Sequence, residues 1–294
     1  MKDSPSLRSR LFVALQYLLP QRLLSGLIGR IARARAIWIR KPLIRAFVRA
    51  YRPELADALQ PDPLAYESFN AFFTRALRAD ARPAASAPDA IVSPVDGRIS
   101  ALGATLRGRI IQAKGRDYSL QGLLAGNAPL AAGLTGGSFM TVYLAPFNYH
   151  RIHMALAGTL VGAWYVPGRL FSVNDATAAL VPDLFARNER VILEFSGAAG
   201  RHVLVMVGAL FVGSMATVWH GDIARSGTHG VATLPLPTDG SGHLARGAEV
   251  GRFNMGSTVI LLLPPGMGAW KHDLADFSEL RVGQTVGRVA ATAV

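Results

Sequence analysis

The sequence predicts an α+β protein: N-terminal amphipathic helices precede a mostly antiparallel β domain, either a barrel-like sheet or a sandwich. Three observations predict this class. Leucines and arginines recur at helical spacing through the first 52 residues. Short apolar runs bounded by Gly, Pro, Asn and Asp follow from residue 91 onward. Residues 81–90 form a small, proline-containing stretch typical of a linker. We therefore expect a helical region at residues 1–85 and a β-rich domain at residues 86–294.

The first helix is predicted from leucines that fall on one broad helical arc. They are Leu7, Leu11, Leu15, Leu18 and Leu19, with Phe12 beside them. The best apolar run, residues 11–20, is too short for a transmembrane span of about 20 residues. A secretory signal is also disfavoured, because no small-residue cleavage site follows and arginines continue instead.

A second helix is predicted to begin at Pro42, because proline is tolerated in the first turn of a helix. Its apolar and basic residues separate onto two sides. One side holds Leu43, Ile44, Phe47, Val48 and Tyr51, and the other holds Arg45, Arg49 and Arg52. Aliphatic stripes opposed by arginines suit a helix lying in the headgroup layer of a membrane. The alternative is that these helices pack on their own domain.

Charge is concentrated in this leader. Residues 1–52 contain twelve Lys and Arg residues and one acidic residue, Asp3, whereas the whole chain carries +12. Nucleic acid and anionic lipid both attract basic segments, but so many bulky aliphatic residues favour an anionic membrane surface over nucleic acid. The chain has no cysteine, which excludes disulfides, thiolate metal sites and a cysteine nucleophile.

Further along, Ser68 is predicted to cap a short helix through Phe69, Phe72, Phe73 and Leu77. Strands are predicted where Val, Ile and Leu dominate short runs. These runs are residues 109–113, 139–144, 159–166, 190–195, 203–212 and 259–263. A helix is expected at residues 175–188, where the alternation is lost.

The first candidate for chemistry is Ser257, which stands between Gly256 and Thr258 before the apolar run at residues 259–263. A serine at the mouth of a buried strand, preceded by a flexible glycine, can turn its hydroxyl onto the preceding carbonyl. In isolation, a turn leading into a core strand is the better explanation of these residues.

Two histidines form the second candidate, His150 and His153 in the segment YHRIHM at residues 149–154. No third histidine or carboxylate stands at ligand spacing, so we expect no metal site. A general base or proton donor is more plausible, because the unperturbed pKa of histidine is about 6.5. Two histidines held in a hydrogen-bond network at a strand end remain the alternative.

The third candidate is Asp96 in the segment SPVDG at residues 93–97. Asp-Gly is a favoured hairpin dipeptide, so Asp96 alone fits a turn residue better than an orienting carboxylate.

These segments, in this order, resemble the bacterial phosphatidylserine decarboxylases, a pyruvoyl-dependent, self-processing family. The matching segments are QYLLP (16–20), FNAFF (69–73), SPVDG (93–97), QAKG (112–115), LLAGN (123–127), YHRIHM (149–154), YVPG (165–168), LFSVN (170–174), LFARNER (184–190), GRF (251–253) and GST (256–258). The resemblance covers almost the whole chain.

The resemblance implies a charge-relay set of Asp96, His153 and Ser257 that drives self-cleavage between Gly256 and Ser257. In the family, the activated serine attacks the preceding carbonyl, and the resulting ester undergoes β-elimination. The dehydroalanine left at position 257 then hydrolyses to a pyruvoyl group and ammonia. The products here are a large chain, residues 1–256, and a small pyruvoyl chain, residues 257–294.

The resemblance also implies the reaction. The pyruvoyl made from Ser257 forms a Schiff base with the amine of phosphatidylserine and accepts the electrons that remain as carbon dioxide leaves. His150 is the implied proton donor, and phosphatidylethanolamine is the product. The large and small chains are expected to form a heterodimer, and two such units a homodimer. The expected location is peripheral, on the cytoplasmic side of the cell membrane.

Three positions depart from the usual bacterial pattern. Met255 stands where leucine is common, a volume-conserving change. Asn148 stands where aspartate is expected, and Ala155 where proline is expected. A missing carboxylate near two histidines removes an interaction that raises their pKa, so the pH dependence is expected to change.

The residues also leave other functions open. A catalytically silent, membrane-bound family member would keep the fold without the chemistry. A serine hydrolase would use Ser257, His153 and Asp96 on an external ester, but such enzymes present the serine on a strand-to-helix elbow, whereas a strand follows here. A pyruvoyl enzyme for a soluble amino acid fits the basic amphipathic leader poorly. A pyridoxal-phosphate enzyme would need Lys114 or Lys271, and neither stands in a recognisable cofactor context.

Overall fold

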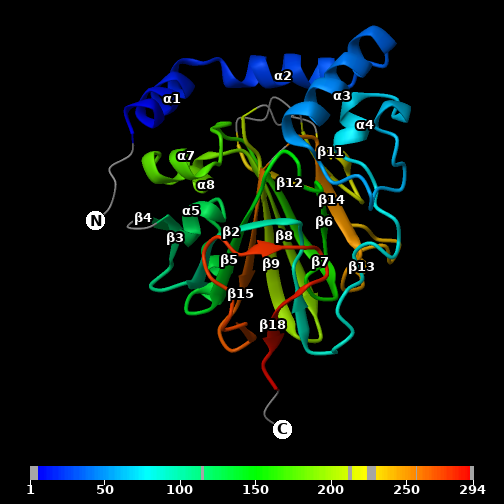
Figure 1. The fold of residues 1–294 in the computed structure, drawn as a ribbon. Helices are drawn as coiled ribbons and strands as arrows, with labels where there is room; N and C mark the ends of the chain where they lie inside the picture. Colours follow the sequence, from blue (N-terminus) through cyan, green and yellow to red (C-terminus); the bar gives the residue numbers. More distant parts are fainter. Residues whose placement is uncertain (1–5, 114–115, 211–213, 224–229, 256, 292–294) are drawn as a thin grey trace.

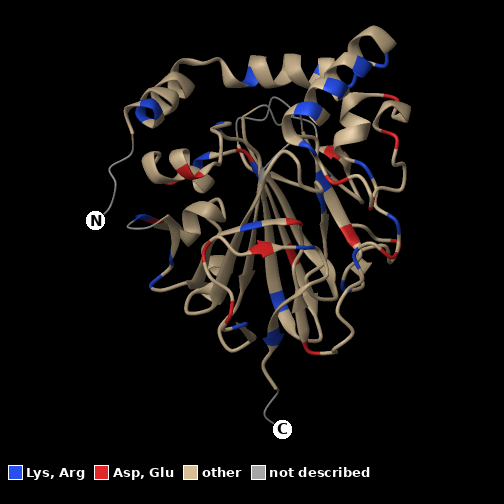
Figure 2. Cartoon of the chain, viewed as in Figure 1, with Lys and Arg blue, Asp and Glu red and all other residues tan. Residues whose placement is uncertain are grey.

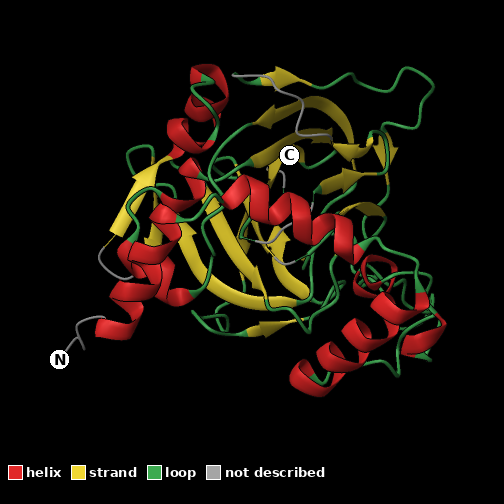
Figure 3. Cartoon of the chain, turned by 90° about the horizontal axis from the view of Figure 1, so that it is seen from above, coloured by secondary structure: helices red, strands yellow, loops and turns green. Residues whose placement is uncertain are grey.

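The computed structural model describes residues 6–113, 116–210, 214–223, 230–255 and 257–291, except for the side chain of Ser257. Three N-terminal helices lie across one end of a β-rich body, and the C-terminus lies at the opposite end (Figure 1). Figure 3 shows the same helices from above, crossing the ends of the strands. The predicted order, helices first and then mostly antiparallel sheets, is confirmed. The boundary at residue 85 stays a prediction.

The helices fall into an N-terminal group and a second group within the body. The first comprises α1 (Leu7–Leu18), α2 (Gln21–Ala32), α3 (Ile37–Tyr51), the 3-10 helix η1 (Pro63–Ala65) and α4 (Phe69–Phe73). The second comprises α5 (Leu120–Leu123), α6 (Ala128–Leu134), α7 (Asp175–Leu180) and α8 (Leu184–Arg187). The segment predicted as one helix at residues 175–188 is helical, but it is divided into α7 and α8 at residues 181–183. Ser68 caps α4, as predicted, by accepting a hydrogen bond from the Ala71 backbone amide.

Among the described residues, the paired strands form four sheets, and every pair in a sheet is antiparallel. The nine-stranded sheet contains β12 (Ala232–Thr233), β7 (Gly158–Val166), β8 (Arg190–Gly197), β9 (Gly200–Val207), β15 (Ser257–Leu263), β5 (Ser138–Leu144), β2 (Gly97–Ala104) and β17 (Glu279–Leu280), with β13 (His243–Leu244) also pairing with β7. The four-stranded sheet contains β11 (Gly221–Ile223), β10 (Met215–Thr217), β14 (Glu249–Phe253) and β6 (Arg151–His153). The two smallest contain β1 (Ala90–Val92), β18 (Thr285–Val289) and β16 (Gly268–Trp270), and β3 (Arg109–Ala113) with β4 (Arg116–Ser119).

The nine-stranded sheet is covered on both faces, which explains the near-continuous apolar runs of its central strands. One face packs against the four-stranded and three-stranded sheets, through residues such as Leu261, Met206 and Phe253. The other face packs against the helices of the body, through residues such as Ile260 and Phe185. Alternate residues of β15 thus enter opposite cores. The arrangement is a sandwich, and the described strands form no closed barrel.

The first helix was predicted correctly, but the second begins five residues earlier than expected. Helix α3 starts at Ile37 and contains Pro42 in its interior. A proline removes one backbone hydrogen bond, and residues 37–41 still complete a turn before it. Helix α2 was not predicted as a separate element.

The apolar side of α3 packs against the protein rather than facing outward. For this helix, the alternative to lipid contact, packing on its own domain, is therefore correct. Ile44 is fully buried, and Phe47 lies edge-on to Phe69, Phe72 and Phe73 at ring separations of 5.2–6.0 Å. In contrast, the leucine arc of α1 is exposed, with Leu11 and Leu18 at 62% and 82%. Figure 2 shows Lys and Arg without Asp or Glu along these three helices.

Among the described residues, no single helix is long and apolar enough to cross a bilayer, although α1 and α2 would qualify as a pair that bends by 89° at the break between them.

Candidate active site

The predicted nucleophile heads the most protected strand of the large sheet. Ser257 begins β15, which lies between β5 and β9, and its backbone pairs with Leu144. From Thr258 to Leu263 every residue of the strand is buried, so the start of the strand is firmly fixed. The predicted cleavage site reaches beyond what the structure describes, because Gly256 and the side chain of Ser257 lie outside the described residues.

The two residues before Gly256 are held in a strained and fully bonded arrangement. Met255 has φ of 103°, a value that costs a residue with a side chain about 1–3 kcal/mol. The side-chain nitrogen of Asn254, Nδ2, donates to Ser214 Oγ at 2.6 Å and to Asp222 Oδ1 at 2.7 Å. The side-chain oxygen of Asn254 accepts from Asn70 Nδ2 at 3.1 Å. Three separate segments therefore fix the backbone that leads to the predicted scissile bond.

Asp96 lies immediately before β2 and is held by an arginine. Arg82 donates to both Asp96 oxygens, at 2.8–3.2 Å, and to Asp57 Oδ2 at 2.6 Å, while the Val282 amide donates to Asp96 Oδ1 at 2.8 Å. Burial opposes the charge of Arg82, but its hydrogen bonds to the two carboxylates outweigh burial and raise its pKa. Asp96 therefore belongs to a buried ion cluster, in addition to its position next to a turn.

His153 lies on β6 beside the Asp96 segment, because the His153 amide donates to the Pro94 carbonyl at 2.8 Å. The Nδ1 atom of His153 is 2.8 Å from the Gly247 carbonyl, which requires a proton on Nδ1. The Nε2 atom then accepts from the Tyr149 hydroxyl at 3.1 Å. Burial lowers the pKa of His153, opposed in part by its hydrogen bond to the Gly247 carbonyl and by the charges of Glu249 and, least, Asp96. No hydrogen bond joins the described side chains of Asp96 and His153 directly.

His150 is fully buried in the loop between β5 and β6. Its Nδ1 donates to the Asn148 carbonyl at 2.9 Å, and its ring lies 4.1 Å from that of Phe73. Its Nε2 is buried and has no hydrogen-bond partner in the part of the chain that the structure describes. Burial lowers the pKa of His150 to about 3, so the ring is neutral near pH 7 with a free lone pair at Nε2.

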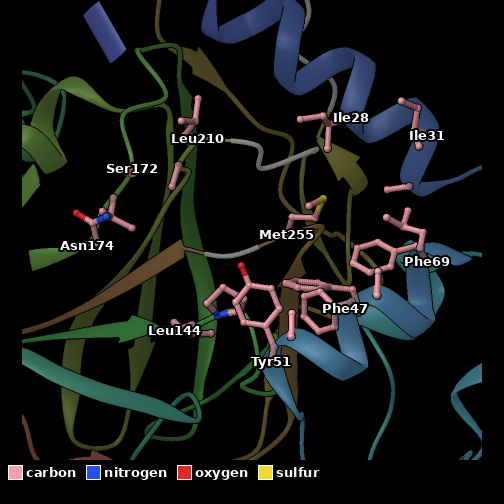
Figure 4. A pocket seen from close by; sticks show the side chains of 18 of the residues that line it. Ile28, Ile31, Phe47, Tyr51, Phe69, Leu144, Ser172, Asn174, Leu210 and Met255 are labelled. Atoms are coloured by element: carbon pink, nitrogen blue, oxygen red, sulfur yellow. The ribbon is translucent and has the colours of Figure 1, made fainter. Parts of the chain in front are cut away.

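A cavity of about 600 Å³ lies between the N-terminal helices and the end of β5, and its walls are almost entirely apolar. Figure 4 shows Ile28 and Ile31 of α2 on one side, Phe47 and Tyr51 of α3 below, and Met255 at the centre. Leu144, the backbone partner of Ser257, also lines it. This volume is typical of a small-molecule or lipid site.

Two family models match this chain. A family model described as phosphatidylserine decarboxylase matches residues 69–288, and a model described as PSD matches residues 11–52. The chain belongs to the phosphatidylserine decarboxylase family.

Curated members of the family match almost the full length. A phosphatidylserine decarboxylase proenzyme from Azotobacter vinelandii is 48% identical over 97% of this chain and all of the relative. Those from Ectopseudomonas mendocina and Bordetella pertussis are 49% and 48% identical, covering 96% and 98% of this chain and 99% and 97% of the relatives. The resemblance drawn from the motifs is thus confirmed, and with it the expectation of an enzyme of the carboxy-lyase class.

Two departures from the family pattern have a structural account. The Asn148 side-chain oxygen accepts a hydrogen bond from the Ala145 backbone amide at 2.7 Å. The Asn148 backbone amide in turn donates to the Ala145 carbonyl at 2.9 Å. An asparagine oxygen therefore closes this loop as a carboxylate would, without adding a charge. Ala155 is buried, and its carbonyl accepts from the Val92 amide at 3.1 Å.

Sequence reasoning missed three residues around these groups: Arg75, Arg82 and Tyr149. Arg82 lies in the stretch interpreted as a linker, where a lone arginine among small residues has no periodicity. Tyr149 was noted only as part of the histidine segment. A charged residue directly after a phenylalanine-rich helix was the one available signal for Arg75.

Proposed function

We propose that this chain cleaves itself between Gly256 and Ser257, converts Ser257 into a pyruvoyl group, and decarboxylates phosphatidylserine to phosphatidylethanolamine at a membrane surface. The observation that carries the proposal is the pairing of Ser257 with Leu144. From Leu144 the chain runs directly into the loop that bears His150, and Leu144 itself lines the apolar cavity. The pairing with Leu144 therefore connects the proposed nucleophile to the loop that bears His150 and to the apolar cavity.

In the proposed cleavage, the Ser257 hydroxyl attacks the Gly256 carbonyl, and the serine nitrogen leaves that carbon to give an ester. Elimination across the Ser257 Cα–Cβ bond breaks the ester and frees the Gly256 carboxylate. Water then replaces the nitrogen, which leaves as ammonia. His153 suits the base role, because its Nδ1 proton is fixed on the Gly247 carbonyl and its lone pair is at Nε2. The charge of Asp96 favours the imidazolium that forms.

The surrounding residues fit a pyruvoyl group at position 257. When present, that group supplies a carbonyl that condenses with the substrate amine and takes up the electron pair left as carbon dioxide departs. His150 offers a buried, unpartnered Nε2. A negative charge developing beside it would raise its pKa from about 3, so the ring could hold a proton when one is needed. We assign His150 the role of proton donor to the product carbon.

The N-terminal helices support a membrane surface as the working location. Helices α1 and α2 turn polar residues inward, since Gln16 and Gln21 are buried and accept from the amides of Ser172 and Leu170. Their leucines point outward, Leu23 being 76% exposed. This inverted pattern suits contact with lipid. Because α2 also lines the cavity, a lipid has a short path from the bilayer to the site.

Cleavage at this position would leave the two chains bound to each other. Strand β15 of the small chain lies between β5 and β9 of the large chain, while β18 pairs with β1 and β17 pairs with β2. Both chains contribute to one core, so the processed heterodimer stays a single folded unit.

Intact masses under denaturing conditions test the proposal. Two chains are expected, the smaller beginning at residue 257 and blocked as a pyruvoyl. Ser257→Ala should give one uncut chain without decarboxylase activity. His150→Ala should still be cleaved but release no carbon dioxide, with exposed His272→Ala as the control. A single, unblocked chain in the wild-type protein would contradict the proposal and favour a silent family member. Release of fatty acid without carbon dioxide would favour a serine hydrolase.

A further inference from the structure

Arg75 is a buried cation without a carboxylate partner. It follows α4, and the residue is only 3% exposed. Its Nη2 atom is 3.3 Å from the Phe147 carbonyl and 3.5 Å from the Glu54 carbonyl. The Nε and Nη1 atoms are buried and have no hydrogen-bond partner in the described part of the chain. Among the described residues, no Asp or Glu oxygen lies within the 4.0 Å of an ion pair with Arg75.

Burying a guanidinium in this way costs folding free energy unless another group accepts its hydrogen bonds. A guanidinium keeps its charge at any physiological pH, and its donors lose water on burial. Buried charges in proteins are therefore almost always paired or hydrogen-bonded. The stacking of Arg75 on Phe72, at 5.8 Å from the ring centroid, offsets only part of this cost.

Arg75 lines a polar pocket of about 270 Å³ that also contains Asp96, Asn148 and Tyr149. The pocket is large enough for a phosphate or a carboxylate. Two of its carboxylates, Asp57 and Asp96, are already bound by Arg82 at 2.6 and 2.8 Å.

The remaining acidic groups of the pocket do not serve Arg75 either. Glu54 is paired with Arg281 at 3.0 Å, and Glu279 is exposed to water. The pocket is therefore lined by a buried cation, two of whose donors have no partner among the described residues, while its carboxylates are paired elsewhere or solvated. That combination fits an anion.

We propose that Arg75 binds the phosphate of the phosphatidylserine headgroup, which rests on the proposed function. The substrate carries two anionic groups, a phosphate diester and a carboxylate. A cation on the carboxylate would stabilise the ground-state charge, which must move onto the remaining carbon as neutral carbon dioxide leaves, and would therefore slow the reaction. The phosphate is unchanged by the reaction, so it can be bound tightly throughout.

The position of Arg75 supports this assignment. Arg75 touches the Phe147 carbonyl, in the same loop that carries His150, and its charge acts to lower the pKa of His150. An anion bound at Arg75 would cancel that effect, so substrate binding would make it easier for His150 to hold a proton.

Inhibition and kinetics of the processed enzyme test the site. Short-chain phosphatidylserine is the substrate, and glycerophosphoserine, inorganic phosphate and free serine are the probes. Glycerophosphoserine should compete at least tenfold more effectively than serine. Arg75→Gln should raise KM about tenfold with kcat within about twofold, and Arg75→Lys should restore part of the affinity. The matched control is Arg78→Gln, because Arg78 lies on the same segment, is half-exposed and does not line the pocket.

Equal inhibition by serine and glycerophosphoserine would overturn the proposal, as would an unchanged KM in a folded Arg75→Gln variant. Inhibition by phosphate without competition by glycerophosphoserine would overturn the headgroup assignment and indicate a free-phosphate site. If the variants do not fold, the wild-type inhibition series still decides. If the chain is never cleaved, the proposed function fails separately, and phosphate binding to the uncut chain is measured by its thermal shift.

Discussion

Arg33 and Asn254 bind the same two side chains. Arg33 Nη2 lies 2.8 Å from Ser214 Oγ and 2.9 Å from Asp222 Oδ2, while Asn254 Nδ2 lies 2.6 Å from that same hydroxyl and 2.7 Å from Asp222 Oδ1. Arg33 caps the C-terminal end of α2, and Asn254 stands two residues before Gly256. The docking of an N-terminal helix is therefore connected to the backbone of the predicted cleavage site.

Removing this arginine should slow self-cleavage. In Arg33→Ala, Ser214 and Asp222 lose a shared donor, and Asn254 is held less firmly. The ion pair is partly exposed, so an effect of about 1 kcal/mol, or roughly fivefold in rate, is expected. The half-time of conversion of the newly made chain, followed in cell-free translation, measures it.

The control for this experiment is Arg30→Ala, one turn earlier on α2 and exposed. Asp222→Asn should slow cleavage in the same way, because it removes the ion pair but keeps an acceptor for Asn254. Equal half-times for all three variants and the wild type would show that helix docking does not affect the site.

Arg82 should be essential for stability as well as for placing Asp96. In Arg82→Gln the carboxylates of Asp57 and Asp96 lose their shared cation, and breaking a buried ion pair from one side costs about 3 kcal/mol. Urea denaturation of the uncut Ser257→Ala background measures the loss without interference from cleavage. Arg281→Gln is the control, because Arg281 also approaches Asp57, at 3.8 Å, but is 59% exposed, so its loss should cost less than about 1 kcal/mol.

The predictable parts of the fold were those with local periodicity. The run at residues 259–263 is buried on both faces and could only be a core strand, and the leucines of α1 repeat at helical spacing. Helix α2 was missed because its buried positions are Gln21, Ser25, Gly29 and Ala32, which are polar or small, so no apolar stripe faces the protein.

The residues of the candidate site also differ in how far the sequence could predict them. Asp96, His153 and Ser257 were found because their segments match a family in order, and no local pattern singled them out. The roles of Arg75, Arg82 and Asn254 depend on partners distant in the chain. Asn254, for example, binds Ser214 and Asp222, which lie 40 and 32 residues earlier in the sequence. A separation of that length along the chain does not indicate a contact. Such pairings come from the sheet register, which a single sequence does not reveal.

Stability should fall as the pH is lowered from about 6.5. Burial lowers the pKa of His202 to about 4, whereas an unfolded histidine titrates near 6.5. Between these values the unfolded chain binds the proton and the folded chain does not, so acid favours unfolding. The full difference corresponds to about 3 kcal/mol. His150 contributes in the same direction.

Urea denaturation of the Ser257→Ala background at pH 7.5, 6 and 5 measures this dependence. His202→Leu should flatten it, because the leucine keeps most of the volume against Phe195 without a titrating group. The exposed residue His272 provides the control, and His272→Gln should leave the slope unchanged. A slope as steep in His202→Leu as in the wild type would show that other groups govern acid unfolding.

Restoring the carboxylate that the family pattern expects should shift the pH dependence of cleavage. Asn148→Asp keeps the acceptor for the Ala145 amide and adds a negative charge near His150 and His153. A nearby carboxylate raises the pKa of both histidines. Because the base must be unprotonated, the acidic limb of the cleavage rate should move to higher pH by up to about one unit. The control Asn127→Asp keeps its helix cap and adds the same charge at α6, and an equal shift there would indicate a general charge effect.

Membrane binding should depend more on the leucines of α2 than on the arginines of α3. Leu23 and Leu27 are exposed on α2, and changing both to Gln removes apolar area that would otherwise enter lipid, with an expected loss of about a hundredfold or more in affinity for anionic vesicles. Neutralising Arg45 and Arg49 should weaken binding less, by about 1 kcal/mol per charge and only at low salt.

Flotation with vesicles of defined anionic content compares these variants with Leu106→Gln, an equally exposed leucine on the body. If the α2 variant floats as well as the Leu106 variant, the outward leucines do not contact lipid. Helix α2 would then serve only as a wall of the cavity, held by Gln21 and Arg33, and the substrate would have to reach the cavity by another route.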